Sequence, residues 1–189
     1  MRFDPYSRVH KGLRTLLFDT AALVARTDFS GGETHFGASD PVGCTLDAVR
    51  VLLGFLREHG EHEDRVVMPE LRRLGPEVCS RLAEEHAALE ELHHLIEVLV
   101  ARIDAGGAER AALGRELDAA LTRLVVRHLE HMEREEAEGN SVLWAALDDG
   151  ELEVLLGRIL ATIGPERMQQ WRTLIAPTLA ARERQALAR

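Results

Sequence analysis

Two histidines in this chain are each followed four residues later by a glutamate, and two further histidines occupy separate helical patterns. Residues at i and i+4 share one face of a helix, one turn apart, so such a pair can reach one metal ion, or the carboxylate can bridge to a second ion. Imidazole and carboxylate groups are the ligands with which proteins hold iron, zinc or manganese. The candidate ligands are His10, His59, Glu63, His86, His131 and Glu135.

The apolar periodicity predicts an all-α fold in which these residues belong to four long helices. We expect the helices at about 7–26, 40–75, 76–105 and 108–138. In an up-down-up-down four-helix bundle, the start of the first and third helices and the end of the second and fourth share one end. All six candidate ligands then lie at one level of the bundle. Four buried histidines without a shared purpose would each need a separate hydrogen-bond partner, which makes a chance arrangement costly.

Local sequence signals set the expected helix boundaries. Asp40 is a candidate N-cap with proline at the next position, and Pro69 predicts a kink in the second helix. Gly106-Gly107 predicts a turn, and Gly139-Asn140 predicts the end of the fourth helix. The segment 27–43 is long for a bundle connection, so it is either functional or merely mobile.

The C-terminal part predicts further helices that pack on the bundle. We expect helical pieces at about 141–148, 150–163 and 165–187, with apolar residues at helical spacing. Their apolar face must be covered by the same chain or by another subunit, so a homo-oligomer formed through these helices is one expectation. We therefore assign residues 1–148 to the bundle and 149–189 to a helical extension of the same domain.

The composition restricts the class of protein. The 189 residues are 46% hydrophobic and only 4% aromatic, which suits helices, and the net charge is −9. Without a basic patch we expect neither nucleic acid nor an anionic membrane as partner. Cys44 and Cys79 lack metal-ligand spacing, and we interpret Cys79 as a small apolar helix residue. The sequence shows no signal peptide and no apolar run of about 20 residues, so we expect a cytoplasmic protein.

Four motifs, in order, resemble the hemerythrin-like, His-His-Glu cation-binding family of non-haem di-iron bundles. They are Val-His-Lys-Gly-Leu-Arg at 9–14, His-Gly-Glu-His-Glu-Asp-Arg at 59–65, Glu-His-Ala-Ala-Leu at 85–89 and His-Met-Glu-Arg-Glu-Glu at 131–136. The resemblance covers about residues 6–148. It implies two iron ions bridged by an oxo or hydroxo group and two carboxylates, with zinc or manganese as alternative occupants. Oxygen carriers of the family have a histidine where this chain has Glu90, so the chain is more similar to the branch with four histidines and two glutamates.

Five further residues are candidates either to bind a metal or to orient a ligand. His62 is close in sequence to the His59 motif, and His128 lies on the face of His131, one turn deeper. His93 continues the interior line of His86 and is more simply a hydrogen-bonded core residue. The full set is His62, His128, Glu90, His93 and Tyr6.

The acidic run at 133–138, apart from Glu135, is interpreted as a solvated helix face, and His35 and His94 as exposed.

The leading functional hypothesis is a di-iron protein that binds or senses a small ligand such as dioxygen, nitric oxide or peroxide. Apolar residues in the layer below would keep the open metal position dry: Leu13, Leu56, Leu89 and Leu124. The first alternative is a di-iron enzyme that acts on nitric oxide or peroxide or in iron-centre repair. The second is a structural or regulatory bundle that binds zinc or no metal. Whether the chain is an enzyme stays open.

Overall fold

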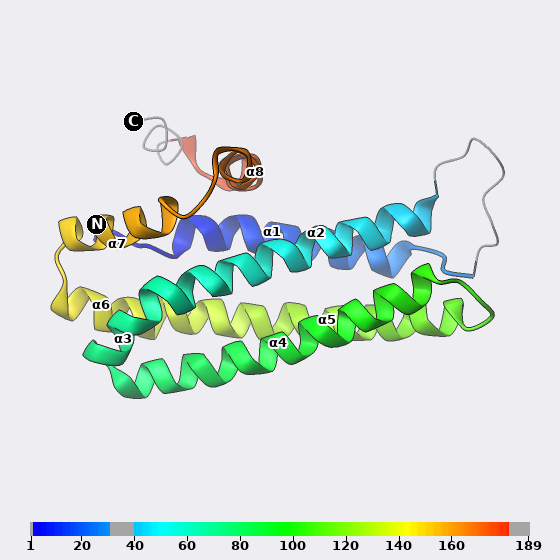
Figure 1. Cartoon of the computed structure of the whole chain (residues 1–189), viewed down its shortest axis with the longest axis horizontal. Coiled ribbons are helices and arrows are strands. Elements are labelled where there is room, and N and C mark those ends of the chain that lie inside the picture. Colours follow the sequence, from blue (N-terminus) through cyan, green and yellow to red (C-terminus); the bar gives the residue numbers. More distant parts are fainter. Residues whose placement is uncertain (1, 31–39, 182–189) are drawn as a thin grey trace.

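Four long helices form the body of the molecule in the computed structural model, which describes residues 2–30 and 40–181. They are α1 (Ser7–Arg26), α2 (Pro41–His62), α4 (Pro76–Asp104) and α5 (Arg110–Arg134). Successive long helices run in opposite directions and lie side by side (Figure 1). Within the described ranges there is no strand. The predicted all-α, up-down-up-down four-helix bundle is confirmed.

Two of the predicted helix boundaries rest on local chemistry that the structure shows directly. The side chain of Asp40 accepts a hydrogen bond from the backbone N–H of Val42 at 3.1 Å and caps α2. Gly106 and Gly107 have φ angles of 78° and 112° in the turn between α4 and α5. Residues with a Cβ atom are strained at such angles, which explains why this turn is made of glycines.

The ends of α2 and α5 differ from the prediction. Each continues through a π-helical turn, η1 (Glu63–Val67) and η2 (Glu135–Gly139), into a short helix, α3 (Met68–Leu74) and α6 (Asn140–Ala146). The irregularity near Pro69 is therefore a widened turn just before the proline, which cannot donate a backbone hydrogen bond. The prediction that Gly139-Asn140 ends a helix is wrong, since the chain stays helical to Ala146.

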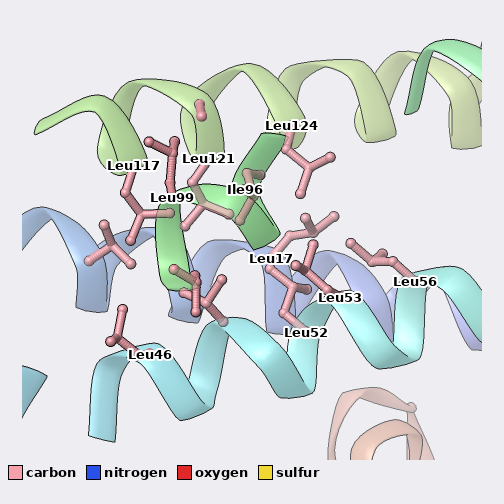
Figure 2. Close-up of a cluster of buried hydrophobic side chains, with 14 of the residues drawn as sticks. Leu17, Leu46, Leu52, Leu53, Leu56, Ile96, Leu99, Leu117, Leu121 and Leu124 are labelled. Atoms are coloured by element: carbon pink, nitrogen blue, oxygen red, sulfur yellow. The ribbon is translucent and has the colours of Figure 1, made fainter. Parts of the chain in front are cut away.

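Leucine and isoleucine side chains from all four long helices fill the half of the bundle beyond the candidate ligands (Figure 2). Fully burying one such side chain stabilises the fold by about 1.5–3 kcal/mol. The layer predicted to lie below the site is buried, with no more than 5% exposure at Leu13, Leu56, Leu89 and Leu124. This core fixes the register of the helices and therefore the positions of the polar residues at the other end.

The C-terminal segment packs on the bundle of its own chain. Its helices are α7 (Asp149–Leu160) and α8 (Pro165–Ile175), followed by the 3-10 turn η3 (Ala176–Thr178). Leu152 and Leu155 of α7 are buried in a cluster with Val67 and Leu71. Trp171 of α8 contacts Phe55 of α2 edge to face, with ring centroids 4.7 Å apart. These contacts cover much of the apolar face, while the part predicted beyond residue 181 lies outside the described residues.

The described helices differ from membrane-spanning helices in their combination of length and composition. Within residues 2–30 and 40–181, none combines the length and the apolar character that crossing a membrane requires.

Candidate metal centre

His10 of α1 and His59 of α2 face each other near the end of the bundle that holds the N-terminus. Their Nε2 atoms lie 3.1 Å apart. Oε1 of Glu63 lies 3.1 Å from Nε2 of His59 and 3.8 Å from Nε2 of His10. Oε2 of Glu135 lies 3.4 Å from Nε2 of His10. All four residues are buried, and we call them the first ligand group.

His86 of α4 and His131 of α5 repeat this arrangement on the other side of the same two glutamates. Their Nε2 atoms lie 3.0 Å apart. Oε2 of Glu63 lies 3.7 Å from Nε2 of His86, and Oε2 of Glu135 lies 3.4 Å from Nε2 of His131. We call these four residues the second ligand group. Each group offers ligand atoms that all lie within 4.8 Å of one another.

The two glutamates are shared by both groups. One oxygen of Glu63 faces the histidines of the first group, and its other oxygen faces His86 of the second. Both oxygens of Glu63, and Oε2 of Glu135, are buried without a hydrogen bond to any described residue. Buried carboxylate oxygens normally have hydrogen-bond or metal partners, because desolvation is otherwise uncompensated. These residues therefore fit a pair of cations that the carboxylates would bridge.

The outer nitrogen of three of the histidines is held by another carboxylate. His10 Nδ1 donates to Glu136 at 2.9 Å, His86 Nδ1 donates to Asp64 at 2.8 Å, and His131 Nδ1 donates to Glu85 at 2.9 Å. Such bonds fix the ring orientation and leave Nε2, directed into the site, as the free acceptor. Donation from Nδ1 thus prepares each imidazole for a metal ion.

Burial and neighbouring charges pull the pKa values of the first histidine pair apart. Burial lowers the pKa of His59 to about 3, against the opposing attraction of Glu63. Burial also acts to lower the pKa of His10, but its hydrogen bond to Glu136 and the nearby carboxylates of Glu63 and Glu135 outweigh burial and raise the pKa to about 9. At neutral pH His59 is neutral, as a ligand must be, whereas His10 must release a proton before it can bind a metal.

The second group borders a cavity of about 510 Å³ between α2 and α4. His86 and His131 form part of its wall, as do Glu61 and Asp64. The cavity continues to His93, a residue of the next layer. The centre is therefore reached from solvent on the α2–α4 side.

The comparisons with known proteins agree with this geometry. Residues 4–138 match the model of the hemerythrin HHE cation binding domain. The chain belongs to this family. No curated protein and no solved structure matches the chain. The matched range includes all six candidate ligands, but it ends before α7 and α8 begin.

The structure brings the six main candidates of this hemerythrin domain together and leaves the five others outside the ligand groups. His93 and His128 form a separate buried pair with Nε2 atoms 3.2 Å apart. Glu90 is exposed and lies 3.3 Å from Nδ1 of His93. His62 borders a different cavity, beside α7 and α8.

Of these five, Tyr6 contacts the first ligand group, because it stacks on His10 with ring centroids 5.5 Å apart. His94 is exposed as predicted, and His35 lies outside the described residues.

The sequence does not predict the role of three carboxylates that hold the outer nitrogens of the histidines: Asp64, Glu85 and Glu136. Glu136 was interpreted as part of a solvated face, and this is wrong, because it binds both His10 and Arg14. One signal could have found it. The motif His-x-x-x-Glu-Asp at 59–64 is echoed by His-x-x-x-Glu-Glu at 131–136. Asp64 and Glu136 occupy equivalent positions in that repeat, and each holds a histidine of the opposite helix pair.

Proposed function

We propose that this hemerythrin-domain chain holds two iron ions and binds or senses a small ligand such as dioxygen, nitric oxide or peroxide. The observation that carries the proposal is the division of the two Glu63 oxygens between two histidine pairs. A carboxylate shared in this way suits two cations a few ångströms apart, as in the di-iron carboxylate bundles. Nitrogen and oxygen donors without thiolate favour iron, manganese or zinc over softer metals.

Each group supplies two imidazoles and two carboxylates, which leaves coordination positions for a ligand. Bound iron would supply such an open position together with a change of oxidation state, the two properties that these ligands require. The chain itself excludes water from below through the buried layer of Leu13, Leu56, Leu89 and Leu124. A site dry on that side favours small, weakly charged molecules over large anionic metabolites.

Tyr6 contributes a hydrogen-bond donor to the same region. Its ring is 2% exposed, and its hydroxyl has no hydrogen-bond partner among the described residues. Burial and the charges of Glu135 and Glu63 raise its pKa well above 10, so the hydroxyl keeps its proton. A Cβ atom at position 139 would lie 3.2 Å from this hydroxyl, so Gly139 leaves it room. We infer that Tyr6 donates to a ligand held at the first group.

The test is elemental analysis and the visible spectrum of protein produced with iron available. We expect about two irons per chain and the strong near-ultraviolet bands of a bridged di-iron centre. Exposure of the reduced protein to nitric oxide or dioxygen should change these bands. Tyr6→Phe should keep the iron and speed ligand release by roughly tenfold, the effect of one hydrogen bond of about 1.4 kcal/mol.

Zinc alone, or well under one transition-metal ion per chain after reconstitution, would overturn the di-iron proposal. Multiple turnovers of nitric oxide or peroxide with an added electron donor would identify an enzyme. Stoichiometric binding without turnover would identify a carrier or sensor. Elemental analysis and steady-state turnover measurements therefore separate the three hypotheses.

A further inference from the structure

A second cavity, of about 370 Å³, lies between the bundle and the C-terminal helices, and we call it the tail cavity. The start of α1, the end of α2 and the turn η1 form one wall, and α7 and α8 form the other. Figure 1 shows α7 and α8 on the same side of the bundle. Its lining is mainly apolar and includes Val9, Val67, Leu156, Ile159, Ile163 and Trp171. Most ligand sites are concave, apolar and about 300–1,000 Å³ in volume. The tail cavity has the size and character of such a site.

The tail cavity is specific to this chain's extension, since the match to the hemerythrin domain ends at residue 138. Residues of α7 and α8 make up the outer wall. His59 and Glu63 of the first ligand group form part of the inner wall. A molecule in the tail cavity would therefore lie next to the metal centre without depending on it for its apolar contacts.

Trp171 gives the tail cavity an unused hydrogen-bond donor. The side chain is 4% exposed, and its Nε1–H has no hydrogen-bond partner among the described residues. The other tryptophan, Trp144, donates its Nε1–H to the backbone carbonyl of Phe3 at 2.7 Å. A buried indole N–H normally finds an acceptor, because the group loses its hydration on burial. A ligand with an acceptor oxygen would satisfy Trp171.

Two arginines line the tail cavity, in a chain whose net charge is −9. Arg8 and Arg172 both belong to its lining, and neither forms an ion pair with another described residue. The one lining carboxylate outside the metal centre is Asp4, and it already accepts hydrogen bonds from the backbone N–H groups of Tyr6 and Ser7. The two guanidinium groups are therefore available to an anionic ligand.

We propose that the tail cavity binds an aliphatic monocarboxylate, with its hydrocarbon chain among the apolar side chains and its carboxylate bound by Arg8, Arg172 and the Trp171 N–H. The apolar lining favours a ligand with a hydrocarbon chain, and the two arginines and the indole N–H favour a ligand with a carboxylate. Because His59 and Glu63 share the wall, occupation of the tail cavity also changes the surroundings of the first ligand group.

Calorimetric titration of the full-length protein with octanoate tests the proposal. We expect saturable binding of one octanoate per chain, and binding of the neutral analogue 1-octanol at least about tenfold weaker. Trp171→Phe keeps the ring and removes the N–H, so it should weaken octanoate binding roughly tenfold. Arg172 is exposed, so Arg172→Gln should keep the fold. It should weaken octanoate binding and leave octanol binding unchanged.

Two tryptophan substitutions on α7 supply the matched control. Leu156→Trp fills the tail cavity and should abolish binding, whereas Val154→Trp, at a position 59% exposed, should leave it unchanged. Circular dichroism establishes that each variant is folded. The proposal is overturned if wild type shows no saturable binding, if octanol binds as tightly as octanoate, or if folded Leu156→Trp still binds. If Leu156→Trp does not fold, unchanged octanoate affinity in both Trp171→Phe and Arg172→Gln overturns it instead.

Discussion

The two ligand groups are built from one repeated motif but lie in different surroundings. His10 and His86 are the equivalent single histidines, and their side chains are 0% and 13% exposed. The carboxylates that orient them differ in the same sense, since Glu136 is 29% exposed and Asp64 is 59% exposed. Glu136 also accepts a hydrogen bond from Arg14 at 2.8 Å. The motif repeats the ligands, but the rest of the fold decides how enclosed each group is.

This difference predicts that the two metal ions are held unequally. The first group lies under Tyr6 and beside the tail cavity, and only one of its histidines, His59, also lines the cavity between α2 and α4. Both histidines of the second group line that cavity. We therefore expect an ion in the second group to be more accessible to water and chelators. Four changes to the chain test this difference between the two groups.

Removal of a shared carboxylate should have the largest effect, because it disrupts both groups at once. Glu63→Ala and Glu135→Ala should each lower the iron content from about two per chain to well below one. Glu61→Ala, at an exposed position of the same segment, is the control and should keep full iron. Retention of two irons in either shared-carboxylate variant would show that the bridging assignment is wrong.

Removal of one histidine should disrupt one group and largely spare the other. His59→Ala should leave about one iron, in the second group, and His86→Ala about one, in the first. The iron that remains in His59→Ala should be removed by a chelator faster than the iron in His86→Ala. His94→Ala, on the exposed face of α4, should behave as wild type. Equal chelation rates in the two variants would contradict the difference in enclosure.

Neutralising the outer carboxylates should weaken metal binding without removing a ligand. Asp64→Asn and Glu136→Gln keep the shape of each side chain and lose the charge that supports the imidazole. Such changes typically cost about 10–100-fold in metal affinity. The loss should be larger for Glu136→Gln, since this residue is more buried and also binds Arg14. Competition with a metal-sensitive dye measures both, and a larger loss for Asp64→Asn would reverse the ranking.

Deletion of residues 149–189 should have the smallest effect on iron content. All six ligands remain, but the apolar wall around Val9 and Val67 becomes exposed. We expect lower solubility or a change of oligomeric state, detected by size-exclusion chromatography, with iron retained. Chelation of the first-group iron should become faster and approach that of the second. A truncated protein that is soluble and unchanged in size but lacks iron would show that the extension contributes to the centre.

Helix positions could be predicted from sequence where one periodic face is buried. In α1, residues at helical spacing on one face are the buried ones, among them His10, Leu13, Leu17 and Val24. The π turns at Glu63 and Glu135 could not be predicted, because one extra residue in a turn leaves no clear mark on an apolar pattern read at 3.6 residues per turn. The sequence predicts a helix end at Gly139, whereas in the structure this glycine lies beside the Tyr6 hydroxyl within a continuing helix.

The candidate ligands could be identified because residue type, helix face and helix direction together limit which side chains can meet. Their unequal enclosure could not, since it depends on packing between segments far apart in sequence, such as Tyr6 with η2 and Trp171 with Phe55. The same holds for the tail cavity. Arg8 and Arg172 are separated by most of the chain, and no pattern within either helix indicates that they line one space.

The exchange of outer carboxylates between the two helix pairs has a consequence for how the centre can be assembled. Asp64 follows α2 but holds His86 of α4, and Glu136 follows α5 but holds His10 of α1. Neither helical hairpin therefore contains a complete ligand group with its supporting carboxylate, although each contains one copy of the repeated motif. Both hairpins must pack together before either ligand group is complete. A chain broken between α3 and α4, at Gly75, would give two fragments whose reassociation and metal uptake are a single event.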